Sequence, residues 1–365
     1  MRTAWRFGVP GGLRRLGVSC LADRGGFMSD QRASWSRRGF IGGLTLAVAN
    51  LLRVRPGHAA AEPPPETTSL RLVLSPAVCF APQFVAKELL RSEGFTDVQY
   101  VRAEGGPYRA LAERRADFNT GLAGQFIIRI DAGDPILILA GTHSGCFELF
   151  ATPDILSVKD LRGKTVAVPS MESSHHIVVI SLAAYVGLDP RKDMTFVTPS
   201  TDEAIRLLAE GKIHAMMGFP PEPQRLRALN VGHAIWNMTT DRPWSQYFCC
   251  MLGANREFVR KHPVATRRAL RAILKANDLC ATNPEQVGQL YVESGFVAPS
   301  HRNFVVQAMR ELPYARWRDY DAEDTVRFQS LRLHEAGLVR SNPAKIIAQG
   351  TDWRFINQLK KELKG

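Results

Sequence analysis

The sequence lacks two features that would indicate a function directly. No apolar run reaches the roughly twenty residues that a membrane-spanning helix needs, and the one in the first 61 residues covers only 40–52. No Cys-x-x-Cys pair is present, and the five cysteines that follow Cys20 have no regular spacing. We therefore expect no metal site, no cofactor and no disulfide framework, and we expect buried, unreactive thiols.

Acidic residues are scarce in the first 61 residues, which contain ten arginines and only Asp23 and Asp30. The formal net charge of the chain is +12, and this segment supplies +8 of it. The other residues have 37 basic and 33 acidic side chains, a net charge of +4. Because the basic excess is confined to the start of the chain, we do not expect a nucleic-acid partner.

The same segment has the order of parts of an export signal. Arg37 and Arg38 precede a weakly apolar run, and alanines occupy 59–61. The paired arginines before Gly-Phe-Ile resemble a twin-arginine signal, which implies a periplasmic protein. We expect translation to begin at Met28, which makes residues 1–27 an upstream extension that need not be translated. We expect cleavage after Ala61; an uncleaved membrane anchor is the alternative.

The remaining chain alternates strand-like and helix-like segments, which is typical of the α/β class. A proline-rich segment, 62–69, is expected to be a disordered spacer. The sequence LAERRADFNTG at 111–121 is similar to LAEGKIHAMMG at 208–218, an offset of 97 residues. We therefore predict two related lobes, the first from 70–152 and 240–365 and the second from 153–239. The expected strands are 70–75, 98–101, 118–121, 136–140, 165–168, 194–198, 215–219 and 232–238.

Six segments between residues 70 and 300 form a recognisable set: LRLVLSP at 70–76, FAPQFVAK at 80–87, LAERRADFNTG at 111–121, VKDLRGKTVAVP at 158–169, GLDP at 187–190 and REFVRKHP at 256–263. Together they resemble the nitrate/sulfonate/taurine substrate-binding proteins of ABC importers. The resemblance implies a two-lobed periplasmic-binding-protein fold, in which each lobe is a doubly wound mixed sheet flanked by helices and ligand binds between the lobes.

Ligands of doubly wound sheets bind beyond the carboxyl ends of the strands, where helix N-termini favour anions. We therefore expect the turns that follow the strands to form the binding site. We expect Trp244 to contribute to it as well, because it lies near the point where the chain returns from the second predicted lobe to the first. The predicted site residues are Cys79, Phe80, Glu104, Gly105, Gly106, Gly124, Gln125, His143, Ser144, Ser170, Ser173, Ser174, His175, Phe219 and Trp244.

The leading functional hypothesis is a monomeric periplasmic receptor that delivers a small molecule to the permease subunits of an ABC transporter in the inner membrane. A sulfonate, nitrate, a small organic acid and a heterocycle all remain candidate ligands. The alternative is a Cys- or His-dependent enzyme on the same fold, related to pyrimidine-precursor synthesis. An enzyme of that kind needs clustered cysteine and histidine residues, and the sequence has no such motif, so we expect no enzyme activity.

Export through the twin-arginine route predicts that Arg37 and Arg38 are both required. Replacing them together by lysine should stop the appearance of the protein in a periplasmic fraction, and N-terminal sequencing of the exported protein should begin at Glu62. Full-level export of the double-lysine variant would contradict the assigned route.

Overall fold

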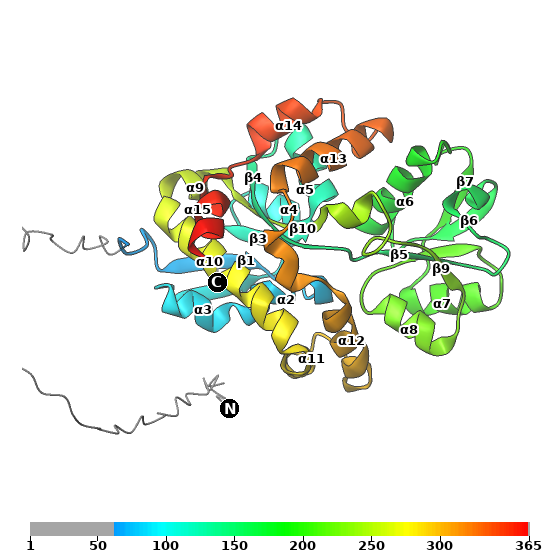
Figure 1. Cartoon of the computed structure of the whole chain (residues 1–365), viewed down its shortest axis with the longest axis horizontal. Coiled ribbons are helices and arrows are strands. Elements are labelled where there is room, and N and C mark those ends of the chain that lie inside the picture. The colour runs from blue at the N-terminus through cyan, green and yellow to red at the C-terminus, as the bar shows by residue number, and fades with distance from the viewer. Residues whose placement is uncertain (1–61, 364–365) are drawn as a thin grey trace, which may run out of the picture. The chain divides into compact units, whose positions relative to one another are not determined.

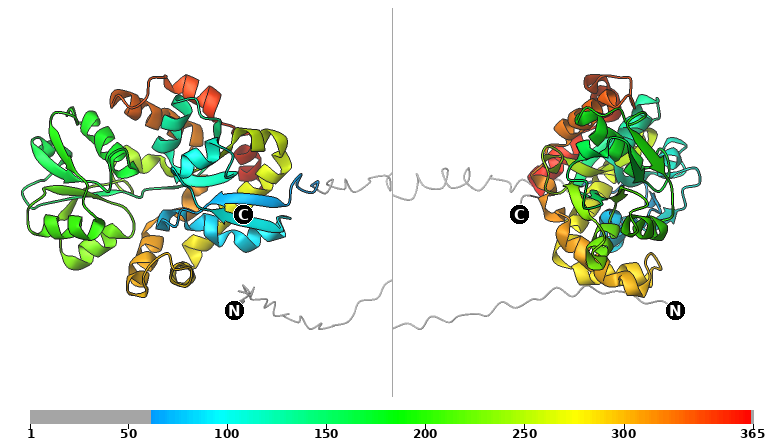
Figure 2. Two further views of the ribbon diagram at one scale, coloured as in Figure 1. Left: turned by 180° about the vertical axis from the view of Figure 1, so that it is seen from behind. Right: turned by 90° about the vertical axis from the view of Figure 1, so that its right-hand side faces the viewer.

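Two five-stranded mixed sheets organise the chain, so the predicted α/β class and two-lobed arrangement are confirmed. The computed structural model describes residues 62–363 (Figure 1). The predicted export signal, residues 1–61, lies outside the described residues. Seen from behind, the same division into two bodies is apparent (left panel of Figure 2). We call the body around the first sheet lobe 1 and the body around the second sheet lobe 2.

The sheet of lobe 1 is parallel except for one inserted strand. β1 pairs in parallel with β2 and β3, whereas β10 runs antiparallel between β3 and β4. In order across the sheet, the strands are β2 (Asp97–Val101), β1 (Ser69–Val73), β3 (Phe118–Leu122), β10 (Phe248–Asn255) and β4 (Ile136–Ser144). β3 and β10 are buried along their whole length, as expected for strands covered on both faces.

The sheet of lobe 2 has the same plan, and β5 is its antiparallel strand, paired with β8 and β9. In order, the strands are β7 (Met194–Val197), β6 (Lys164–Ala167), β8 (Ala215–Gly218), β5 (Glu148–Ala151) and β9 (His233–Asn237). β3 begins at 118 and β8 at 215, while β4 begins at 136 and β9 at 233, so the 97-residue offset seen in the sequence recurs in the strand positions.

Alternate residues of the second sheet pack against helices on opposite faces. Val166 and Met217 pack in the core that contains α6 (Ser174–Tyr185), whereas Ala167 and Met216 pack in a separate core. The latter core contains the apolar faces of α7 (Thr201–Ala209) and α8 (Glu222–Leu229). Because successive side chains of a strand point to opposite faces, α6 covers one face of the sheet and α7 and α8 cover the other. These helices are visible on the right of Figure 1.

Helices also surround the first sheet, and the chain ends in a series of them. Side-chain caps begin several: Asn255 accepts from two N–H groups of α9, and Asp321 and Asn342 cap α13 and α14. The helices are α2 (Ala81–Val85), α3 (Lys87–Ser92), α4 (Pro107–Ala112), α5 (Ala123–Asp131), α9 (Arg256–Lys261), α10 (Pro263–Thr282), α11 (Pro284–Glu293), α12 (Arg302–Glu311), α13 (Ala322–Glu335), α14 (Pro343–Gly350) and α15 (Arg354–Glu362).

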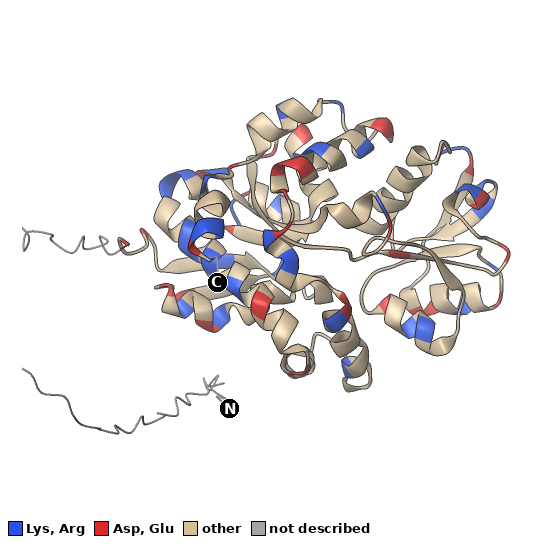
Figure 3. Cartoon of the chain, viewed as in Figure 1, with Lys and Arg blue, Asp and Glu red and all other residues tan. Residues whose placement is uncertain are grey.

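Short 3₁₀ turns complete the described elements. They are η1 (Val78–Phe80), η2 (Val158–Leu161), η3 (Trp244–Gln246), η4 (Pro299–His301) and η5 (Tyr314–Arg318). One of them, η3, lies between β9 and β10, where the chain returns to lobe 1. Within residues 62–363, no helix combines the length and the apolarity needed to cross a bilayer. Lysines, arginines and acidic residues are interspersed over both lobes (Figure 3), in agreement with the small net charge after residue 61.

The predicted boundary of the first lobe at residue 152 is wrong. β4 ends at Ser144, and β5, which begins at Glu148, already belongs to the second sheet. The break occurs at Gly145, whose φ of +70° favours glycine, and a Cβ there would lie 2.2 Å from Oγ1 of Thr239. The outgoing connection, 145–147, therefore lies against the return connection, 238–247. The N–H of Met238 donates to the carbonyl of Phe147 at 2.9 Å and joins the two.

The prediction of a disordered spacer at 62–69 is also wrong, because this segment makes defined contacts with lobe 1. Ser69 is the first residue of β1, and the carboxylate of Glu66 accepts from the N–H groups of Val264 and Ala265 at the start of α10. Glu62 pairs with Arg271 at 2.6 Å. Charged contacts therefore hold this segment against lobe 1. The prediction relied on the proline content of the segment, which contains no information about partners about 200 residues away.

Arg271 on α10 joins three carboxylates. Its guanidinium lies 2.6 Å from Glu62, 2.5 Å from Glu93 and 2.9 Å from Glu362, and its side chain is only 9% exposed. Glu93 is equally enclosed, with 11% of its side chain exposed. The arginine therefore balances charges that come from three distant parts of the chain.

Replacing Arg271 by methionine should lower the free energy of unfolding by about 3–5 kcal/mol, because it leaves the carboxylate of Glu93 buried without its cation. Thermal or urea unfolding measures the loss. The matched control is Arg267→Met, since Arg267 pairs with two of the same acids but is 31% exposed. Its cost should be about 1 kcal/mol. A second change, Glu93→Gln, should restore part of the loss in the Arg271 variant, and equal losses for Arg271 and Arg267 would contradict the assignment.

Candidate functional site

A cleft of about 730 Å³ lies between the lobes. Its walls come from the segments that follow β1, β2 and β3 in lobe 1 and β6 and β8 in lobe 2, together with the outgoing connection. The predicted residues that line it are Phe80, Gly105, Gly106, Gln125, Ser170, Ser173, Ser174, His175 and Phe219. The structure thus brings these residues together from both lobes, and their role as ligand contacts stays a prediction.

Four rings form an aromatic wall in the cleft. Phe147 of the outgoing connection lies 4.9 Å from Phe219 and 5.2 Å from His175, measured between ring centroids. Phe80, from η1, approaches Phe219 at 6.4 Å. Since Phe80 belongs to lobe 1 and Phe219 to lobe 2, the wall crosses the cleft. It offers an apolar surface on which a planar or alkyl group can pack.

Polar groups gather where α6 begins. Ser173 is the N-cap, and its Oγ accepts from the N–H of His176 at 3.3 Å. Glu172 has a φ of +64°, which turns the chain into the helix, and Gln125 of lobe 1 donates to its carbonyl at 3.0 Å. The free N–H groups of the first turn and the positive end of this twelve-residue helix favour a negative ligand group.

Burial keeps the imidazole of His175 neutral. It lowers the pKa of His175 to about 4, so at neutral pH the ring offers one N–H donor, one nitrogen acceptor and no charge. The cations at the cleft are Arg109 and Arg129, which are paired with Glu113 and Asp134, each at 2.6 Å. An anionic ligand would therefore compete with these carboxylates for the guanidinium groups.

Glu222 lies behind His175, in a small cavity that the two residues share with Pro169. The N–H of Phe219 donates to its carboxyl group at 2.9 Å. Burial raises the pKa of Glu222 to about 7, although this hydrogen bond acts in the opposite direction. A carboxyl group that changes charge near neutral pH thus fixes the turn that carries Phe219.

Cys79, His143 and Ser144 are predicted site residues that do not line the cleft. The prediction placed a turn after residue 140, whereas β4 continues to Ser144, and His143 and Ser144 are buried in the strand. His143 contacts the carbonyl of Cys79 through Nε2, and the hydroxyl of Ser144 donates to Tyr320. Cys79 is on the buried side of η1, whereas its neighbour Phe80 faces the cleft.

Glu104, Gly124 and Trp244 are likewise absent from the cleft lining. Gly124 and Trp244 border an adjoining pocket of about 30 Å³, which shares Gln125, Phe147 and Ser174 with the cleft. Trp244 is 3% exposed and packs edge-on against Trp236, with 5.7 Å between their ring centroids. It therefore braces the return connection and does not line the 730 Å³ cleft.

Sequence reasoning missed other lining residues. A helical spacing of four from Gln125 would have found Arg129, and Tyr108 directly follows the glycine-rich turn. Nothing in the sequence marked Phe147, because its position depends on where the chain leaves lobe 1. Pro107, Leu122, Met171 and Glu172 lie within the predicted turns but were not among the predicted site residues. The lining residues outside those turns are Ser75, Ala77, Tyr108, Arg109, Arg129, Phe147 and Pro169.

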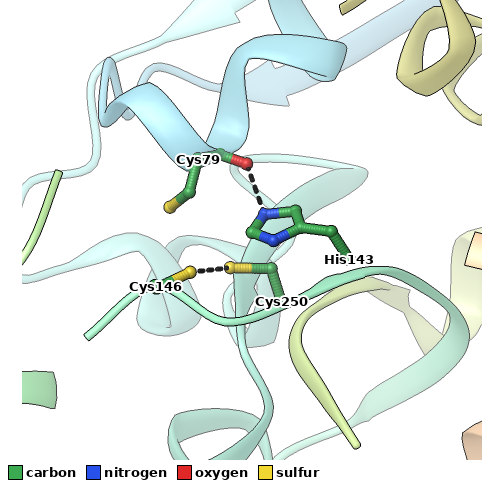
Figure 4. A group of neighbouring side chains, drawn as sticks. All are labelled: Cys79, His143, Cys146 and Cys250. Atoms are coloured by element: carbon green, nitrogen blue, oxygen red, sulfur yellow. Dashed lines mark hydrogen bonds between the residues drawn. The ribbon is translucent and has the colours of Figure 1, made fainter. Parts of the chain in front are cut away.

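Three cysteines and a histidine form a buried cluster in the core beneath the cleft: Cys79, His143, Cys146 and Cys250 (Figure 4). One potential ligand atom from each residue lies within 4.8 Å of the others, and the sulfur atoms of Cys146 and Cys250 are 3.3 Å apart. All four side chains are at most 3% exposed. We call this group the thiol cluster, and it can hold a metal ion. The expectation of no metal site rested on sequence spacing, which cannot reveal such a group.

The groups of the thiol cluster affect one another's protonation. Burial raises the pKa of Cys79 and Cys146. Burial acts in the same direction on Cys250, but hydrogen bonds from neighbouring thiols and the nearby His143 outweigh it and lower the pKa of Cys250. Cys250 is thus the thiol that ionises first. All five cysteines of the described residues are buried and free.

Comparison with known proteins identifies relatives of the chain. The sequence profile of the NMT1-like family matches residues 63–290. The nitrate/nitrite-binding protein NrtA of Synechocystis sp. PCC 6803 is 30% identical over 108 residues, which is 28% of this chain and 23% of that protein. The match thus spans less than a quarter of the length of NrtA.

Solved structures resemble the chain over most of its length. The periplasmic nitrate-binding protein NrtA from Synechocystis PCC 6803 has a TM-score of 0.67 and 16% identity, covering 83% of this chain and 90% of that one. The periplasmic aliphatic sulphonate-binding protein SsuA from Escherichia coli has a TM-score of 0.61 and 16% identity, covering 79% and 94%. At this identity the likeness shows the fold, which is that of periplasmic binding proteins.

The raised pKa of Glu222 predicts a pH-dependent contribution to stability. The folded chain keeps the proton up to about pH 7, whereas the unfolded chain loses it near the ordinary, lower pKa of a glutamate. The contribution is therefore complete in acid and decreases as the pH rises to about 7. Relative to Glu222→Gln, the wild type should lose about 3 kcal/mol over this interval and remain level above it.

Urea unfolding of both proteins between pH 4.5 and pH 8 measures the difference. The half-exposed Glu323 provides the control, because Glu323→Gln removes a carboxylate that is 44% exposed and pairs with the half-exposed Arg327. Parallel stability profiles for the wild type and Glu222→Gln would show that Glu222 keeps an ordinary pKa.

Proposed function

Since this chain belongs to the NMT1-like family, we propose that it is the solute-binding component of an ABC importer. In this proposal the protein is exported to the periplasm by the twin-arginine route and acts there as a monomer. It captures a small molecule between its lobes and delivers it to the permease subunits in the inner membrane.

The observation that carries the proposal is the cleft itself. Chain segments from both lobes line it, and the lobes are joined by two connections only, 145–147 and 238–247, within the described residues. A ligand that contacts Phe80 in lobe 1 and Phe219 in lobe 2 would favour the closed arrangement of the lobes over an open one. A receptor needs this difference between states so that the permease can recognise the loaded form.

The chemistry of the cleft supports a small organic anion as the ligand. The N-terminus of α6, with the hydroxyl groups of Ser170 and Ser174, suits a sulfonate, carboxylate or nitrate group. The aromatic wall suits the rest of an organic molecule, such as an alkyl chain or a heterocycle. NrtA is described as a nitrate-binding protein and SsuA as an aliphatic sulphonate-binding protein, which supports the same class of ligand.

The thiol cluster is the observation that favours the second candidate, a Cys- or His-dependent enzyme on this fold. It supplies the clustered residues that such an enzyme needs, including a thiol of lowered pKa, Cys250, beside His143. However, a nucleophile must reach its substrate, and none of the four residues lines the cleft. The burial of the cluster therefore favours the receptor.

The proposal predicts that a ligand raises the melting temperature. A thermal-shift screen should test nitrate, taurine, alkanesulfonates, small carboxylic acids and nitrogen heterocycles. At least one of these classes should stabilise the folded protein, by about 2.7 kcal/mol when the compound is present at a hundred times its dissociation constant. Ser174→Leu should abolish the shift, since its side chain fills the space where α6 begins.

The control is Ser92→Leu, on an exposed position of α3 away from the cleft. It should bind as the wild type does. Ser173 is unsuitable, because losing its cap costs about 1 kcal/mol by itself. Normal binding by Ser174→Leu would place the site elsewhere, and turnover of a bound compound would favour the enzyme.

A further inference from the structure

The thiol cluster has the composition and arrangement of a metal centre. We propose that Sγ of Cys79, Cys146 and Cys250 and Nδ1 of His143 form a closed, four-ligand site for Zn²⁺ beneath the cleft. Three thiolates and one imidazole are a ligand set that Zn²⁺ prefers, and four protein ligands leave no position open for a substrate. The proposal is independent of the transport function.

The distances in the cluster are close to those that the ion requires. With Zn–S bonds of about 2.3 Å, two thiolates of a tetrahedral site lie about 3.8 Å apart. The sulfur atoms of Cys146 and Cys250 are 3.3 Å apart, and all four ligand atoms lie within 4.8 Å of one another. To produce the tetrahedron, the sulfur atoms of Cys146 and Cys250 would separate by about 0.5 Å, and the widest pair of ligand atoms would approach by at most about 1 Å.

The orientation of His143 suits a ligand. Its Nε2 lies 2.9 Å from the carbonyl of Cys79 and its Nδ1 lies 3.0 Å from the carbonyl of Ser144, so either nitrogen can carry the ring proton. A metal ion on Nδ1 would select the tautomer that has the proton on Nε2. Nδ1 then has a free electron pair, and Figure 4 shows it on the side of the ring that faces Cys250. A metal-bound histidine usually donates its second ring N–H to such a carbonyl, which fixes the tautomer and the angle of the ring. Binding also requires that Nδ1 leave its 3.0 Å contact with the carbonyl of Ser144 and that the coordinating thiols lose their protons.

The backbone aims each thiol at the common centre. Irregularities interrupt the pairing of β10 with β4 on both sides of Cys250, and such bulges redirect a side chain. The turn at Gly145 places Cys146 beneath η1, and the hydroxyl of Tyr314 donates to the carbonyl of Val78 next to Cys79. Four separate elements therefore converge without any short sequence motif.

The ion would act as a structural link. It would join η1 and β10 to the continuous segment formed by the end of β4 and the outgoing connection, where hydrogen bonds and packing already hold them together. Cys79 immediately precedes Phe80, so the link would also hold one residue of the aromatic wall. A disulfide between Cys146 and Cys250 is the competing fate of these thiols, and the two outcomes exclude each other.

The test uses the full chain, reduced and handled without oxygen. After incubation with Zn²⁺ and removal of the excess, elemental analysis should find about one zinc per chain, and chelation should lower the melting temperature. Replacement of Zn²⁺ by Co²⁺ should give the absorption of a tetrahedral cobalt site with thiolate ligands. This second measurement needs no variant, so it does not depend on how a substitution affects folding.

Cys146→Ser and Cys250→Ser should each weaken zinc binding by at least about tenfold, since each removes a thiolate ligand. Cys280→Ser is the matched control, because Cys280 is equally buried but lies on α10 outside the cluster, and it should bind zinc as the wild type does. Failure of the reduced wild type to hold zinc or cobalt would overturn the proposal. Equal loss of binding in Cys280→Ser would do the same.

Discussion

The two lobes depend on one close contact between the chain segments that connect them. At Gly145 no side chain fits, because Thr239 of the return connection occupies the space, and the hydrogen bond from Met238 to Phe147 keeps the two segments together. The positions of the cleft and of the thiol cluster both follow from this contact. Phe147 contributes to the aromatic wall on one side of the connection, and Cys146 points into the core on the other.

The cleft and the thiol cluster are therefore adjacent layers of one region. Phe80 and Cys79 are consecutive residues of η1 that face opposite ways, as Phe147 and Cys146 do in the outgoing connection. A change in one layer must move the backbone that supports the other. An ion in the cluster would not touch a ligand in the cleft. It would instead fix the backbone that positions the side chains of Phe80 and Phe147, as residues behind a binding site commonly do.

The fold was largely predictable from the sequence, whereas the details of the site were not. Parallel strands such as β1 and β6 show apolar runs that are followed by turns, and the 97-residue echo indicated the duplication. β5 and β10 were missed because each is an antiparallel strand that follows, in the sequence, a strand of the other lobe. His143 suggested a turn because it is polar, but internal hydrogen bonds allow it to lie inside β4. Long-range contacts of this kind leave no local pattern.

The placement of β10 imposes an order on folding. All strands of lobe 2 lie between residues 148 and 237, so its sheet can be completed as soon as this stretch has been synthesised. The sheet of lobe 1 begins earlier but cannot close, because β3 and β4 are separated by β10, which follows more than a hundred residues after β4. The first lobe to begin is therefore the last to be finished. Until then β3 and β4 have exposed edges, a state in which chains pair wrongly or need a chaperone.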